Sequence, residues 1–190
     1  MASEWEIELY EEKIKRKKKL GWILYIAVVI GLSYFVITFV GVRTLVSGES
    51  MEPTLSDGDS VFLEKISYRL GEPERFDIVV FPYEYERDIY FIKRIIGIPG
   101  DTIQIKEGVV YLNDKILKKD IYGDDIMYKP GIAEFPVQLG KDEYFVLGDN
   151  RNKSKDSRDP KVGAVSREEL IGRVWIRTWP LSDFGIVDHE

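Results

Sequence analysis

A 23-residue stretch near the start of the chain carries no charged side chain. It runs from Leu20 to Val42 and reads "LGWILYIAVVIGLSYFVITFVGV". A helix rises about 1.5 Å per residue, so this stretch would span about 34 Å, enough to cross a hydrocarbon core of about 30 Å. Large apolar side chains fall on every face, whereas a helix buried in a globular domain normally keeps a polar stripe. The stretch therefore predicts one transmembrane anchor over residues 20–42.

A cleavable signal peptide is the nearest alternative for this stretch. The run is longer than the apolar region of such a peptide, and no clear small-x-small exit precedes Arg43. Six of the seven residues from Lys13 to Lys19 are cations, and Arg43 alone follows closely on the other side. Because cytoplasmic flanks carry the excess of Lys and Arg, we expect residues 1–19 to be cytoplasmic and residues 43–190 to be extracytoplasmic. Beside an anchor, the cationic run favours contact with anionic membrane lipids.

Composition limits the chemistry of the remainder. The chain has 190 residues and a net charge of −6, which argues against a general nucleic-acid-binding surface. It has no cysteine, so thiolate nucleophiles and cysteine-ligated metals are excluded. His189, next to the last residue, is the only histidine, so neither a Ser-His-Asp triad nor a histidine metal site is expected. Catalysis would have to use lysine, carboxylate or hydroxyl groups, and we expect no cofactor and no metal.

Short strands are predicted along most of residues 43–190. Runs rich in β-branched and aromatic residues, such as "RFDIVVF" and "EYFVLG", alternate with Gly, Pro, Asp and Asn turns. The segment "IKEGVVYLNDKIL" predicts two hairpins, with turns at Glu107–Gly108 and Asn113–Asp114. Residues 118–138 are less regular and are expected to form a small lobe or a lid. The fold class is therefore mainly β, in one main domain behind the anchor.

The segment "SGESMEPTL", Ser47 to Leu55, follows the apolar run and contains Ser50. Ser, Gly and Pro are ordinary turn residues, so the segment by itself predicts a turn rather than a site. It matches neither the G-x-S-x-G nor the S-x-x-K hydrolase pattern.

A lysine lies within the predicted strand "DIYFIKRIIGI", Asp88 to Ile98. A period of two places Phe91, Lys93 and Ile95 on one face. On pattern alone this lysine is a snorkelling side chain. To serve as a base, its pKa would have to fall from about 10.4 to about 7, which requires about 4–5 kcal/mol of preference for the neutral form. Apolar enclosure is the environment that produces such a shift.

A polar loop follows the predicted strand at Tyr144. The segment "YFVLGDNRNKSKDSRDP", Tyr144 to Pro160, is dense in side chains that bond to backbone groups and to one another. A calcium loop is the main alternative. Arg151, Lys153 and Lys155 interrupt its acidic residues without the regular spacing of a calcium site, which argues against one.

Four segments in order, "SGESMEPTL", "RFDIVVF", "YFIKRIIGIPGD" and "GDNRNKSKDSR", follow the predicted anchor. Together they resemble the bacterial type I signal peptidases, in the short Gram-positive form with one N-terminal anchor. The resemblance implies a domain of coiled antiparallel β-sheets. It also implies a membrane-bound serine endopeptidase with a Ser-Lys dyad, which removes signal peptides from secreted preproteins after Ala-x-Ala-like sites. The implied partners are these preproteins and membrane lipids, near the protein-export translocon.

The resemblance also assigns residues. It makes Ser50 the nucleophile and Lys93 the general base, while Ser154 hydrogen-bonds and orients the lysine. Asp156 and Arg158 form a charged pair that holds the loop. Asp149 and Asn150 have structural roles at the start of the same segment. The matching substrate-binding positions are Val46, Met51, Leu55, Val80, Phe91 and Ile92.

One position departs from relatives that have two anchors. The residue two before their nucleophile is often a serine that donates to the oxyanion, and here it is Gly48. We expect the Ser50 N–H to be one donor, and the second to come from elsewhere or from a backbone group near Gly48. Ser47 is not assigned that role.

Two other classes of function remain open at this stage. Autoproteolytic repressors resemble this family in their Ser-Lys dyad, but they are soluble and cut an internal Ala-Gly bond, and this chain has no Ala-Gly pair. The other alternative is a non-catalytic, membrane-anchored β domain. Ser50, Lys93 and Ser154 together argue against it.

Overall fold

The computed structural model describes residues 4–35, 41–118, 120 and 126–189. It divides into two compact units, Met1–Val40 and Gly41–Glu190. Each unit is described separately below.

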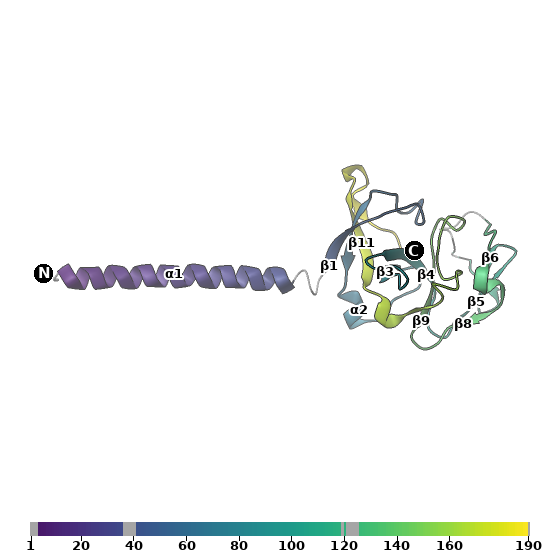
Figure 1. Cartoon of the computed structure of the whole chain (residues 1–190), viewed down its shortest axis with the longest axis horizontal. Helices are drawn as coiled ribbons and strands as arrows, with labels where there is room; N and C mark the ends of the chain where they lie inside the picture. Colours follow the sequence, from purple (N-terminus) through teal and green to yellow (C-terminus); the bar gives the residue numbers. More distant parts are fainter. Residues whose placement is uncertain (1–3, 36–40, 119, 121–125, 190) are drawn as a thin grey trace. The chain divides into compact units, whose positions relative to one another are not determined.

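The first unit is one helix, α1, from Glu4 to Phe35 (Figure 1). Its segment Lys15–Phe35 is exposed and is long and apolar enough, by length and composition, to cross a membrane. The sequence predicted a helical anchor as far as Val42, and this end was wrong. Gly41 and Val42 belong to strand β1, because they pair with Glu64 and Leu63 of the neighbouring strand. The intervening residues 36–40 of the predicted span lie outside the described residues.

The second unit contains a main antiparallel sheet. Its strand order is β1-β2-β11-β3-β4-β9-β10, and β12 pairs with β11. The strands are β1 (Gly41–Leu45), β2 (Ser60–Glu64), β3 (Ile78–Pro82), β4 (Tyr90–Gly97), β9 (Glu143–Leu147), β10 (Val165–Ser166), β11 (Gly172–Trp179) and β12 (Gly185–Ile186). The predicted mainly β fold is confirmed. Strands β4 and β9, which carry the candidate site, are neighbours inside this sheet.

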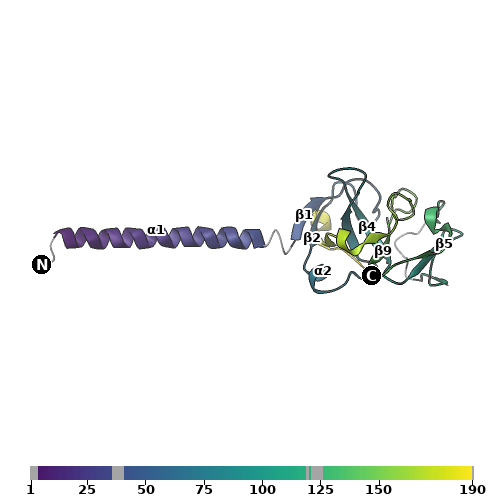
Figure 2. The same ribbon diagram turned by 60° about the horizontal axis from the view of Figure 1, so that its bottom comes forward.

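A second, smaller sheet has the order β7-β6-β5-β8. In both Figure 1 and Figure 2, β5 lies at the opposite end of this unit from β1. The strands are β5 (Thr102–Lys106), β6 (Val109–Leu112), β7 (Lys115–Ile116) and β8 (Val137–Gln138). The short helices of this unit are α2 (Ser67–Leu70), η2 (Gly131–Glu134), η3 (Arg167–Glu169) and η4 (Leu181–Asp183).

Both predicted hairpin turns of the small sheet are present. The first has φ of 52° at Glu107 and 78° at Gly108, and the second has φ of 51° at Asn113 and 62° at Asp114. Positive φ at both central residues matches the twist of a two-residue hairpin, which explains why these residue types stand there. Strand β8 and helix η2 fall within the less regular segment 118–138, of which 119 and 121–125 lie outside the described residues.

Three apolar clusters form the core of this unit, and one of them supports the segment around Ser50. This cluster joins Met51 and Leu55, which are fully buried, to Val61 of β2, Ile78 of β3 and Val174 of β11. Val46, which precedes Ser50, belongs to the same cluster, so buried apolar side chains hold the Ser50 turn on both sides of the nucleophile candidate.

Candidate active site

Ser50 lies in a tight turn between β1 and β2. The backbone N–H of Leu55 donates to the carbonyl of Met51 at 2.8 Å, and Gly58 donates to Val46 at 3.0 Å. Gly48 has a φ of +88°, a conformation that costs a side-chain-bearing residue energy but costs glycine little. Hydrogen bonds and buried apolar neighbours together hold this turn against the sheet.

Lys93 comes from the middle of β4 and meets Ser50 directly. Its Nζ lies 2.8 Å from Ser50 Oγ and also donates to the carbonyl of Ile92 at 2.8 Å. The lysine side chain is almost fully enclosed, with a residue exposure of 3%, and its amine lies 5.0 Å from the centre of the Phe91 ring. The two residues that the resemblance assigned to a dyad are therefore in hydrogen-bond contact.

The environment of Lys93 favours its neutral form. Burial lowers the pKa of Lys93 from 10.5 to about 8, against a smaller opposing effect of the carboxylates Asp156 and Asp149. The alternative of a lysine that extends its amine into water does not fit a side chain enclosed to this degree.

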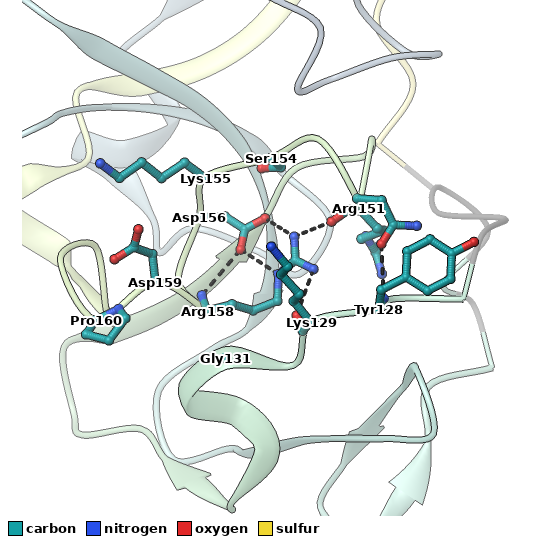
Figure 3. Close-up of a pocket in the computed structure, with 11 residues that line it drawn as sticks. Tyr128, Lys129, Gly131, Arg151, Ser154, Lys155, Asp156, Arg158, Asp159 and Pro160 are labelled. Carbon is teal, nitrogen blue, oxygen red and sulfur yellow. Dashed lines mark hydrogen bonds and ion pairs between the residues drawn. The ribbon is translucent and has the colours of Figure 1, made fainter.

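The loop after β9 borders the dyad through its backbone. The N–H of Asn150 donates to the carbonyl oxygen of Ser50 at 3.1 Å, so the start of the loop is bonded to the nucleophile candidate itself. Asp156 is fully buried and accepts the N–H of Gly148 at 3.1 Å. Arg158 donates to the two oxygens of Asp156 through Nε and Nη2, each at 2.8 Å (Figure 3). The expected charged pair is therefore formed, and it joins two residues of the same loop.

Ser154 lies beside Gly148 and the carbonyl of Ser50, but it does not form the hydrogen bond to Lys93 that the resemblance predicts. A Cβ added at Gly148 would come within 2.2 Å of Ser154 Oγ and 2.4 Å of the Ser50 carbonyl, so the chain packs too closely here for any residue but glycine. Within the described part of the chain, the buried Ser154 Oγ has no hydrogen-bond partner. The amine of Lys93 is directed to Ile92 and Ser50 instead.

A second buried ion pair, which the sequence did not predict, connects the segments that carry the dyad. Arg94 and Asp149 are both fully buried and are joined by two hydrogen bonds of 2.9 Å. Asp149 also accepts the hydroxyl of Thr54 at 2.6 Å. Alternation along β4 turns Arg94 to the opposite face from Lys93. This pair links β4, the loop after β9 and the Ser50 turn, which fits the structural role expected for Asp149.

A cleft of about 560 Å³ contains the dyad. Five of the six predicted substrate-binding residues line it: Val46, Met51, Val80, Phe91 and Ile92. Leu55 was predicted with them but does not line the cleft. It is fully buried in the core, one helical turn after Met51. The cleft is also lined by residues that the sequence did not indicate, among them Asp88, Tyr90, Lys153 and Lys155.

The backbone beside Ser50 limits the choice of oxyanion donors. The N–H of Gly48 donates to a carboxylate oxygen of Asp57 at 2.8 Å. This donor is therefore already engaged, and it would have to give up that bond to reach a substrate oxygen.

Comparison with known proteins gives consistent matches. A family model described as "Signal peptidase, peptidase S26" matches residues 19–179. A probable signal peptidase I-2 of Synechocystis is 41% identical over 177 residues, covering 90% of this chain and 78% of the relative. A signal peptidase IB of Staphylococcus aureus is 34% identical over 183 residues, covering 89% of this chain and 94% of the relative. The crystal structure of a signal peptidase I from Enterococcus faecalis is 29% identical, with a TM-score of 0.41, and covers 54% of this chain and 96% of that one.

Proposed function

The chain belongs to the signal peptidase family, peptidase S26, and is a signal peptidase; we propose that it acts through a dyad of Ser50 and Lys93. The observation that carries this proposal is the 2.8 Å contact between Lys93 Nζ and Ser50 Oγ, made by a lysine that is almost fully buried. A hydroxyl becomes a useful nucleophile when a base of suitable pKa stands within hydrogen-bond reach.

The proposed reaction is acyl transfer in two steps. Neutral Lys93 takes the proton of Ser50, whose oxygen attacks the scissile carbonyl, and the resulting ammonium protonates the leaving amine. Neutral Lys93 then takes a proton from water, which attacks the ester carbonyl. The signal peptide leaves as a carboxylic acid, and Ser50 recovers its proton from Lys93.

The oxyanion of the tetrahedral intermediate needs hydrogen-bond donors. We propose the backbone N–H of Ser50 as one donor, because it belongs to the attacking residue and lies in the fixed turn. The bond from Gly48 to Asp57 argues against the Gly48 N–H as the second donor. In this proposal Ser154 supports the dyad by packing beside Ser50.

Cleavage after small residues is proposed from the apolar wall of the cleft. Val46, Met51 and Val80 are at least 95% buried, so the wall is shallow and backed by packed core. Such a wall accepts an alanine side chain, and larger side chains would have to displace well-packed neighbours. This supports a preference for Ala-x-Ala-like sites.

Helix α1 is proposed as the membrane anchor of the enzyme. The cationic run from Lys13 to Lys19 favours a cytoplasmic N-terminus and an extracytoplasmic catalytic unit, beside anionic lipids and near the export translocon. External protease added to spheroplasts should then digest the catalytic unit and spare the N-terminal segment. The reverse pattern of protection would contradict the orientation.

Cleavage of a membrane-inserted preprotein by the wild type and by Ser50→Ala tests the proposal most directly. The wild type should release a mature protein that begins one residue after an Ala-x-Ala site, as read by N-terminal sequencing. Ser50→Ala should release none, while the matched change Ser182→Ala, at an exposed residue of η4, should leave cleavage unchanged. An active Ser50→Ala enzyme would refute the dyad.

The two alternatives predict different outcomes in the same assay. An autoprotease would shorten its own chain and leave the preprotein intact. A non-catalytic domain would leave both intact, although the enclosed contact between Lys93 and Ser50 would then have no purpose.

A further inference from the structure

Three lysines line the cleft, and they differ in their partners. Lys93 is enclosed beside Ser50. Lys153 forms an exposed ion pair with Glu49 at 2.6 Å. Lys155 is exposed, donates to the hydroxyl of Tyr83 at 2.5 Å and lies 4.3 Å from the centre of that ring. Among the described residues, Lys155 forms no ion pair with a carboxylate, so its positive charge is available to a ligand in the cleft.

A row of stacked groups connects Lys155 to the dyad. The Tyr83 ring stacks on the Phe91 ring, with centroids 4.7 Å apart and planes 14° apart. The amine of Lys93 lies 5.0 Å from the centre of the same Phe91 ring. Lys155 and Lys93 are thus joined through two contiguous aromatic rings. These three contacts set an upper limit of about 14 Å between the two amines, and an extended peptide advances about 3.3 Å per residue, so Lys155 lies within about four residues of the scissile bond.

The chemistry of the dyad indicates which part of a substrate lies along this row. Lys93 protonates the leaving amine, so the chain that follows the cut must depart on the side of the lysine amine. The apolar wall formed by Val46, Met51 and Val80 belongs to a different core cluster from Phe91, and it suits the small residues before the cut. The row through Tyr83 is therefore on the mature side of the scissile bond.

Lys155 also borders a second hollow, of about 430 Å³, whose lining residues are drawn in Figure 3. Its side chain points away from the pair of Asp156 and Arg158, with its amine at the free end. The other cations of this hollow include Arg158 and Arg151, which are paired with Asp156 and Asp120 respectively. The charge of Lys155 is therefore not tied into the network that holds the loop.

We propose that Lys155 is a specificity-determining residue that favours substrates with Asp or Glu among the first four residues after the scissile bond. The inference rests on the proposed function. A lysine ammonium has three donors, and the bond to Tyr83 uses one of them, so two remain for a carboxylate. The Tyr83 ring and hydroxyl hold the amine in place, which reduces the entropy that a free surface lysine would lose on pairing.

The test compares peptides that differ at one position. They share one Ala-x-Ala sequence and carry Glu, Gln or Lys at one of the first four residues after the cut, each position tested in turn. The ratio of kcat/KM for the Glu peptide to that for the Lys peptide is measured at low salt for the wild type, Lys155→Gln and Lys155→Glu. An exposed charge pair alters binding by about 1.5- to 5-fold, so the wild type should favour Glu by about that factor. Lys155→Gln should bring the ratio close to one, and Lys155→Glu should reverse it.

Lys161→Glu is the matched control. Lys161 is also exposed and lies over a tyrosine ring, 5.7 Å from the centre of Tyr85, but it does not line the cleft. This variant changes the net charge as much as Lys155→Glu and should keep the wild-type ratio. An equal change in both variants would mean that net charge, not Lys155, sets the preference, and would overturn the inference.

The remaining outcomes separate this inference from the proposed function. If the wild type cleaves none of the peptides and no preprotein, the proposed function fails. If it cleaves the Glu, Gln and Lys peptides at equal rates at all four positions, the inference alone is overturned. If Lys155→Gln alters only the processing of preproteins in anionic vesicles, Lys155 serves a lipid headgroup and the inference is again overturned. Loss of the Glu preference in added salt supports it, because salt screens exposed pairs.

Discussion

The enclosure of Lys93 has two consequences, one for catalysis and one for stability. Burial lowers the pKa of the amine to about 8, which makes a neutral base available near neutral pH. The same burial destabilises the fold whenever the amine is protonated. A side chain placed for catalysis is thus expected to cost folding energy, as is common at active sites.

The pH dependence of cleavage follows from the direction of this shift. In the proposed mechanism the neutral lysine is the active form, so kcat/KM should rise with pH, with a midpoint near the Lys93 pKa of about 8, and then level off. The measurement is the rate on a short Ala-x-Ala peptide between pH 5 and pH 11. A rise that continues without a plateau to pH 11 would indicate an ordinary, solvated lysine. Lys93→Arg should be inactive throughout, because a guanidinium stays charged over this range.

Replacement of this lysine by an apolar residue should stabilise the protein while it abolishes cleavage. One pKa unit corresponds to about 1.36 kcal/mol, so the shift from 10.5 to about 8 opposes folding by on the order of 3 kcal/mol at pH 7. Lys93→Met keeps the volume but loses two hydrogen bonds of about 0.5–1.5 kcal/mol each, which leaves a gain of roughly 0–2 kcal/mol in the free energy of unfolding.

The gain in the free energy of unfolding from Lys93→Met should decrease as the pH rises. Below pH 8 the wild-type lysine is protonated in both the folded and unfolded states, and the gain is full. Between pH 8 and 10.5 the unfolded state binds more protons, so wild-type stability rises with pH and the gain shrinks. Denaturant unfolding at pH 7 and pH 10 measures it, with Lys115→Met, an exposed site on β7, as the control. A destabilised Lys93→Met at pH 7 would contradict the cost assigned to burial.

At the scale of strands and loops, local patterns predicted local structure. Alternation placed Phe91, Lys93 and Ile95 together, and two pairs of turn residues predicted the hairpins of the small sheet. The helix end at Val42 was wrong because an uncharged sequence does not distinguish a helix from an edge strand. Pairing with β2 decides that point, and it depends on residues about 20 positions away in the chain.

Contacts between distant segments explain what the sequence did not show. The bond of Arg94 to Asp149 joins residues 55 positions apart, and the single-sequence pattern of β4 gives no sign of it. Leu55 was placed in the cleft because the family resemblance assigns it to the substrate-binding positions, but here its side chain is buried in the core cluster that also contains Met51. The position of Ser50 and Lys93 in contact was expected only from the family resemblance.

The buried ion pair of Arg94 and Asp149 should be the strongest single interaction between β4 and the loop after β9. Asp149→Ala leaves a fully buried guanidinium without its carboxylate, which typically costs about 3–5 kcal/mol. Glu72→Ala, which removes the exposed partner of Arg167, should cost less than about 1 kcal/mol. Both are measured by denaturant unfolding.

A double replacement tests whether charge or shape matters at this pair. Arg94→Met with Asp149→Leu removes both charges and keeps most of the volume, so it should recover much of the stability lost in Asp149→Ala. If the double variant is less stable than Asp149→Ala, the hydrogen bond from Arg94 to the carbonyl of Phe76, which Asp149→Ala retains, matters more than the charge balance.

At the scale of the whole chain, the boundary between the two units defines where a soluble enzyme should begin. The second unit starts at Gly41, and β1 pairs along five residues with β2. Gly41 fits there because a Cβ would lie 2.0 Å from the carbonyl of Leu63. The strand also supplies Thr44 and Leu45 to the wall of the cleft. A truncation that follows the predicted end of the anchor, at Val42, would therefore remove part of the catalytic unit.

Two truncated chains make this prediction measurable. A chain that begins at Gly41 should fold and cleave a short Ala-x-Ala peptide within about twofold of the full-length enzyme, because cleft and dyad are complete. It should process membrane-inserted preproteins at least about tenfold more slowly, since tethering raises the effective concentration of an enzyme and a substrate that share a bilayer. A chain that begins at Val46 lacks β1 and should lose stability and peptide cleavage together. Equal processing in bilayers by the Gly41 chain and the full-length enzyme would show that α1 does not contribute as an anchor, and full activity of the Val46 chain would show that β1 lies outside the catalytic unit.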